Sequence, residues 1–170
     1  MPLLRLSNQE IYRKKLLKEF STKLPSGDLF LPILDTYGDL SDEEIFFKQR
    51  AIFHEKKWHE ICLDDAKEFD FDWGPFSALS KLGEIYYLPA FLSYFYEVEN
   101  LKKGNIGDYF DSIFFSVLAS KEATESFTIE QSKLIALFLI NLSNLVDDTY
   151  GAEQEYQKEL TSNWGHFLLF

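Results

Sequence analysis

The sequence contains little cysteine, glycine or proline: one Cys, eight Gly and five Pro among 170 residues. A single thiol, Cys62, cannot form an intramolecular disulfide, so the chain offers no disulfide framework and fits a reducing compartment. The glycines form neither a Gly-x-Gly-x-x-Gly pattern nor a P-loop. The sequence therefore excludes an intramolecular disulfide scaffold and predicts no phosphate cradle and no nucleotide cofactor.

Long apolar runs are also missing. The most apolar stretch, residues 134–142, spans nine residues, whereas a membrane-spanning helix needs about twenty. Residues 1–7 lack the charged region and apolar run of a secretory signal. We therefore expect a cytoplasmic protein that makes no contact with a membrane.

Signals for strands are scarce, because Val occurs only three times and alternating apolar and polar residues are rare. Helix starts are indicated by capping boxes at Ser7 with Glu10, Ser41 with Glu44, and Thr128 with Gln131. We predict an all-α fold, a compact single-domain bundle of about five to seven helices over residues 1–170.

Apolar periodicity and turn signals place the expected elements. Pro89 is expected to end or kink a helix that Ser80 caps, which gives a Pro-bent helix pair at 80–98. Residues 25–39 and 64–75 are predicted loops. The other predicted helices are a first one ending near Lys23, a second from Ser41 to about Cys62 with a break near His54, and helices at 108–119, 129–145 and, weakly, 152–162.

The sequence is rich in acidic and aromatic residues. Its 28 acidic and 17 basic residues give a net charge of −11, and 17% of the residues are aromatic. So much apolar surface is typical of a folded chain, while the negative charge disfavours binding to nucleic acid. Residues 61–170 hold 18 acidic residues and only 7 basic ones, so the charge is concentrated in the later part of the chain.

Signals for catalysis are weak. His54 and His59 are five residues apart, which in a regular helix turns the second imidazole by roughly 140° from the first, so no shared metal is expected. His166 is distant in the sequence, and there is no Gly-x-Ser-x-Gly elbow. Cys62 is predicted to be a buried structural thiol. We expect neither a metal nor a cofactor.

A resemblance to a known family runs along much of the chain. The segment Tyr86-Tyr87-Leu88-Pro89-Ala90 resembles the Tyr-Leu-Pro-Ala signature of a bacterial family of small helical domains of unknown function. Similar segments surround Trp58 upstream and Phe127 to Gln131 downstream, so that the resemblance covers about residues 10–143. It implies a helical bacterial domain but no established activity and no catalytic residues. The acidic stretch at 64–72 departs from what a typical member contains.

That acidic stretch is the candidate site. Together with Trp73, which follows it, the stretch combines five carboxylates with three aromatic side chains. This composition is suited to steering and anchoring a basic protein partner. The alternative is that the aromatics pin the loop to the core and the acids only keep it solvated. The candidate partner-binding residues are Asp64, Asp65, Glu68, Asp70, Phe71, Asp72 and Trp73. The terminal residues 167–170 present a similar choice between docking on the domain, which is favoured, and contacting another chain.

We therefore expect a non-catalytic acidic binding protein, with an immunity or antitoxin-type inhibitor of a basic bacterial toxin as the specific form. One alternative is a small enzyme of unrecognised class with a site near His59 and Tyr86 or Tyr87. The other is a homo-oligomeric scaffold assembled through the C-terminus.

Overall fold

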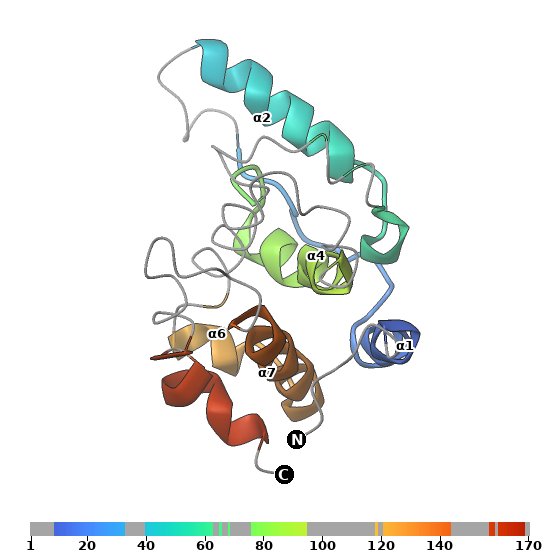
Figure 1. Cartoon of the computed structure of the whole chain (residues 1–170). Coiled ribbons are helices and arrows are strands. Elements are labelled where there is room, and N and C mark those ends of the chain that lie inside the picture. Colours follow the sequence, from blue (N-terminus) through green and yellow to red (C-terminus); the bar gives the residue numbers. More distant parts are fainter. Residues whose placement is uncertain are drawn as a thin grey trace.

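The computed structural model describes residues 9–32, 40–62, 65, 68, 76–94, 118, 121–143, 157–158 and 160–168. The regular elements in these ranges are helices, which confirms the predicted all-α class (Figure 1). The only strand-like feature there is an isolated antiparallel bridge between Phe30 and Leu79. None of the described helices has the length and apolarity that a bilayer crossing requires. The predicted helix at 108–119 lies outside the described residues, apart from the buried Leu118.

Helix α4 (Lys81–Tyr94) lies between α2 and α7 in the bundle (Figure 1). Ser80 caps it, because its hydroxyl accepts a hydrogen bond from the amide of Gly83 at 3.2 Å. Of the two predicted outcomes at Pro89, an end or a kink, the end is wrong, since one helix continues through that residue. Proline inside a helix costs about 3 kcal/mol, but each large apolar side chain that the helix buries returns roughly 1.5–3 kcal/mol, so packing outweighs the proline. Residues 95–98 of the expected pair lie outside the described residues.

Helix α1 (Gln9–Glu19) buries one narrow stripe. Tyr12, Leu16 and Phe20 follow one another at intervals of four residues and are at most 5% exposed. The Tyr12 hydroxyl donates a 2.9 Å hydrogen bond to the carbonyl of Leu134, which ties α1 to α7. The predicted end near Lys23 is four residues too late, because Leu24 is 37% exposed and does not extend the buried stripe.

Helix α2 (Leu40–Phe53) begins one residue before the predicted cap and ends at the predicted break. Glu55, in the turn after α2, has a φ of 62°, in the left-handed region. A short 3-10 helix, η3 (Trp58–Glu60), follows. The predicted burial of Cys62 is wrong, because its side chain is exposed. Ile61 is extended and faces the core, and side chains alternate in extended chain, so the next residue points outward.

Helix α7 (Ile129–Ser143) contributes to the core, and the capping box predicted at its start is confirmed. The Thr128 amide donates to the side-chain carbonyl of Gln131 at 2.9 Å, and the Gln131 amide donates to the Thr128 hydroxyl at 3.3 Å. Helix α6 (Lys121–Glu125) precedes it in the chain. The C-terminal segment forms a π-helical turn, η7 (Leu160–Trp164), and a 3-10 turn, η8 (Gly165–Leu168), which both pack on α7.

Two anchors hold these outer segments to the bundle. Trp164 is fully buried, and its indole N–H donates to the carbonyl of Leu118 at 3.2 Å. The second anchor holds the loop at 28–31 against the start of α4, because the Ser80 amide donates a hydrogen bond to the carbonyl of Leu29 at 2.9 Å. Phe167 and Leu168 are partly buried against the core. The expected docking of the C-terminal segment is thus seen up to Leu168, and residues 169–170 lie outside the described residues.

Candidate functional site

The acidic stretch singled out in the sequence is described at two positions, Asp65 and Glu68. Asp65 is a local structural centre. Its carboxylate accepts hydrogen bonds from Lys56 Nζ at 2.6 Å, from the Cys62 amide at 2.9 Å and from the Cys62 thiol at 3.2 Å. The remaining candidate residues lie outside the described part: Asp64, Asp70, Phe71, Asp72 and Trp73.

These contacts determine the electrostatic state of Asp65. Partial burial opposes its ionisation, but the hydrogen bonds from Lys56 and from Cys62 outweigh that burial and lower the pKa of the carboxyl. The charge of Asp65 is therefore neutralised within the molecule by Lys56. The side chain of Glu68 is exposed, while its amide donates to the carbonyl of Asp65 at 3.1 Å. Of the two described carboxylates, Glu68 is the one that faces solvent.

The second candidate site, around His59 and the tyrosine pair, is largely occupied by structural hydrogen bonds. The buried Tyr87 hydroxyl lies 2.9 Å from the carbonyl of Lys56 and 3.1 Å from that of Phe53. Burial raises its pKa strongly, with the charges of Tyr86 and Glu60 adding to the effect. Because its proton is directed at the turn that follows α2, Tyr87 holds that turn against α4.

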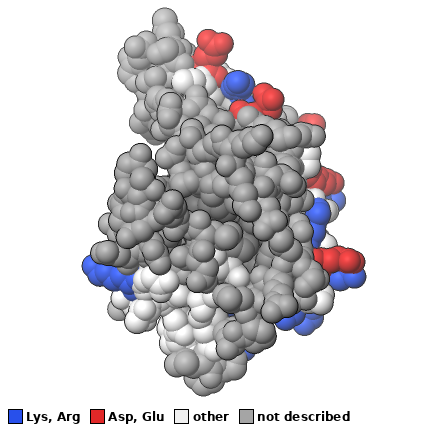
Figure 2. Space-filling view, viewed as in Figure 1, with Lys and Arg blue, Asp and Glu red and all other residues white. Residues whose placement is uncertain are grey.

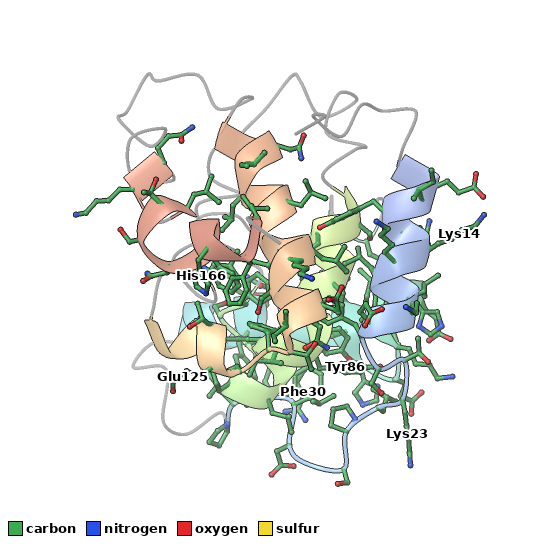
Figure 3. The ribbon with its side chains drawn as sticks, turned by 90° about the horizontal axis from the view of Figure 1, so that it is seen from below. Lys14, Lys23, Phe30, Tyr86, Glu125 and His166 are labelled. Carbon is green, nitrogen blue, oxygen red and sulfur yellow. The ribbon has the colours of Figure 1, made fainter. Side chains whose placement is uncertain are left out.

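Tyr86 and His59 have separate surroundings. The Tyr86 hydroxyl lies 3.4 Å from the carbonyl of Thr22, in the loop after α1 (Figure 3). His59 is half-buried beside Trp58, with ring centroids 5.6 Å apart. Its Nδ1 atom is buried and has no hydrogen-bond partner in the described part of the chain. The two tyrosine hydroxyls are thus directed to backbone carbonyls of different segments rather than to a shared substrate position.

Metal-ligating side chains were the remaining chemical possibility. His54 follows the end of α2, whereas His59 lies in η3, so the two histidines do not share a regular helix. Among the described residues, no three His, Cys, Asp or Glu side chains gather closely enough to hold a metal ion.

A groove that the sequence did not indicate lies between α1, α7 and η8. It has a volume of about 260 Å³. Its apolar lining comes from Leu134, Leu137, Phe167 and Leu168, and its charged lining from Lys15, Lys18, Glu19, Glu130 and Lys133. Residues from three distant parts of the chain form this groove, and no spacing within the sequence brings them together.

The charges of the described residues are nearly balanced. Thirteen of the 17 basic residues and 14 of the 28 acidic residues lie in the described ranges, which leaves 4 basic and 14 acidic residues elsewhere. On the face shown in Figure 2, described Lys or Arg side chains alternate with Asp or Glu along one edge, and a further basic group lies at the opposite edge. The described residues taken together are therefore close to neutral.

No protein-family model, curated protein or solved structure matches this chain. The resemblance to the Tyr-Leu-Pro-Ala family therefore stays a prediction.

Proposed function

We propose that this protein is a non-catalytic binding protein of the immunity or antitoxin type, which masks a basic bacterial toxin domain. The observation that carries the proposal is the acidic excess of the chain. It is concentrated in residues 61–170, which hold 18 acidic residues and only 7 basic ones. Carboxylates concentrated in this way accelerate the encounter with a cationic partner.

The positions of the tyrosines support the same proposal over the enzyme alternative. A general acid needs a pKa near the working pH and a hydroxyl that reaches substrate. The pKa of Tyr87 is raised by burial, and its hydroxyl is directed at the backbone of residues 53 and 56. These properties are those of a structural hydrogen-bond donor.

Salt dependence tests the proposal directly. We expect the neighbouring reading frame to encode a protein with a basic domain that co-purifies with this chain as a one-to-one complex. Because the Debye length falls from about 10 Å at 0.1 M to about 3 Å at 1 M ionic strength, the association rate and affinity should both fall with added salt. A complex whose affinity is unchanged across that range would contradict an electrostatic interface.

A pair of charge-reversal variants locates the interface. The double variant Asp70→Lys/Asp72→Lys should weaken binding of the basic partner by at least about tenfold, because repulsion replaces attraction at the predicted contact. The matched control is Glu44→Lys/Glu125→Lys, which makes the same charge change at two exposed positions of the scaffold and should alter binding far less. Equal losses in both variants would remove the 64–73 stretch from the interface and leave only a general charge effect.

A further inference from the structure

The groove between α1, α7 and η8 combines an apolar floor with a cationic rim. Leu137 and Phe167 are partly buried and belong to the margin of the core. Lys15, Lys18 and Lys133 stand around them, together with two carboxylates. The lining therefore has a small excess of positive charge, opposite in sign to the net charge of −11 of the whole chain.

The positive charges of the three lysines all act on Glu130, at the rim of the groove. Lys133 Nζ lies 2.8 Å from Glu130, and that ion pair is the main cause of the lowered pKa of Glu130, to which the charges of Lys18 and Lys15 also contribute. Lys18 Nζ lies 3.0 Å from Glu19. Lys15 forms no ion pair with another described residue, so its ammonium is available to an anionic group at the groove.

The size of the groove restricts its occupant. A partner helix lying in a groove needs apolar pockets for several successive turns, and binding sites for drug-sized molecules have volumes of roughly 300–1,000 Å³. The groove, at about 260 Å³, lies at the lower edge of that range, and its apolar lining on α7 spans about one turn, from Leu134 to Leu137. It suits a single apolar chain that packs on Leu134, Leu137 and Phe167 and ends in one charged group.

We propose that this groove binds a small amphiphilic anion, an alkyl chain of about ten carbons carrying one carboxylate, whose tail lies on the apolar floor and whose head faces Lys15. The lysine stems contribute to the apolar walls, and their ammonium groups remain in water beside the head group. This site is independent of the proposed binding of a basic partner, so the failure of one proposal leaves the other intact.

Decanoate, below the concentration at which it forms micelles, is the direct probe. We expect it to shift the nuclear magnetic resonance signals of the Leu137 methyl groups in a saturable manner, with a dissociation constant of about 0.1–1 mM for a ligand of this size. Decyltrimethylammonium has the same tail with the opposite charge and should bind at least about tenfold more weakly. Equal binding of the two amphiphiles, or no saturable shift with decanoate, would overturn the proposal.

Two variants of α1 test the role of the rim. Lys15→Glu should weaken decanoate binding by about 3–10-fold, because it replaces an attractive charge with a repulsive one. Lys14→Glu makes the same change at the next residue, which does not line the groove and points away from α7 (Figure 3); it should have less than about a twofold effect. Equal weakening by both variants would show that only the net charge of the protein matters.

A third variant tests the floor. Leu137→Trp fills the groove and should abolish decanoate binding, and a thermal melt distinguishes a blocked groove from an unfolded protein. If the variant does not fold, Phe167→Ala removes the partly buried ring from the other wall and should weaken binding by about 3–10-fold. Binding of an acidic amphipathic peptide by a chain that does not bind decanoate would replace the proposal with a peptide site.

Discussion

Helices α4 and α1 pack against one another but use their residues in different ways. In α4, the seven residues from Tyr86 to Leu92 are all buried, so the central part of this helix is enclosed on every side. In α1, the buried side chains form one stripe, and Ile11 and Leu17 are 54% and 39% exposed on the rest of the surface. A helix that is apolar all round belongs to the core, whereas a one-stripe helix has a face to present to other molecules. Helix α4 therefore contributes mainly to the stability of the fold, whereas α1 also presents an exposed face to other molecules.

The largest effect should come from emptying the centre of α4. Phe91 is fully buried, and its ring centroid lies 4.6 Å from that of Phe76 and 6.2 Å from that of Phe53. Phe91→Ala should lower the free energy of unfolding by about 3–5 kcal/mol, through lost burial and the cavity left behind. Urea denaturation measures this value. Leu17→Ala on the exposed side of α1 is the control and should cost less than about 1 kcal/mol. If both variants lose the same free energy of unfolding, the different contributions of α4 and α1 to stability are wrong.

A smaller loss of stability is expected where α4 approaches the loop at residues 28–31. A Cβ atom at Gly83 would lie 2.1 Å from the carbonyl oxygen of Leu29, which is backbone and cannot easily yield. Gly83→Ala should therefore destabilise the protein by about 1–3 kcal/mol, despite the better helix propensity of alanine.

The control for this position is Gly27→Ala. There the new Cβ would lie 2.7 Å from Leu82 Cδ2, the tip of a flexible and exposed side chain. That tip can rotate away, so the variant should lose less than about 1 kcal/mol in the same denaturation assay. If Gly83→Ala is as stable as the parent chain, the close approach of the loop to α4 is wrong.

The hydroxyl of Tyr87 should contribute about 1–2 kcal/mol, because Tyr87→Phe removes the donor at 2.9 Å from the Lys56 carbonyl. The Phe53 carbonyl keeps the hydrogen bond from the Lys56 amide at 3.0 Å. Tyr86→Phe loses a 3.4 Å contact with the Thr22 carbonyl and a hydrogen bond with the Trp58 backbone. Its hydroxyl is less buried than that of Tyr87, so this variant should cost less. Urea denaturation of the two variants compares these losses. An equal loss in both would contradict the distinct roles given to the two tyrosines.

The same hydroxyl predicts a pH dependence. The pKa of Tyr87 is raised by burial, so the folded state retains this proton at a pH where the unfolded state, with a pKa of about 10, releases it. The stabilisation by Tyr87 is therefore complete below about pH 10 and falls as pH rises through the folded-state value. The stability difference between the parent chain and Tyr87→Phe should shrink above pH 10, and a difference that grows there would contradict the burial of the neutral phenol.

The smallest change in stability is expected from a substitution on the exposed face of α1. Lys14 and Glu10 form an exposed ion pair at 2.7 Å. Lys14→Ala should leave the free energy of unfolding nearly unchanged, because water and salt screen such pairs. Any difference should vanish in 1 M sodium chloride. A clear loss of stability that persists in salt would show that this side of α1 contributes more than an exposed ion pair.

Local signals were read correctly from the sequence where they depend on neighbouring residues. The Thr128 and Gln131 capping box, the cap at Ser80 and the break near His54 all form as predicted, because each depends on contacts within a few residues. The continuation of α4 through Pro89 could not be predicted in this way. The free energy that outweighs the proline comes from packing against segments far along the chain.

The sequence by itself determined that this protein is helical and acidic, since periodicity, capping residues and charge are properties of the chain. Only the tertiary structure decided that Asp65 is neutralised by Lys56, that the Tyr87 proton is directed at the turn after α2, and that lysines 118 residues apart, Lys15 and Lys133, share the rim of one groove. Such arrangements depend on which distant surfaces meet when apolar area is buried. One sequence spacing cannot specify that meeting, because it is a property of the whole packed core.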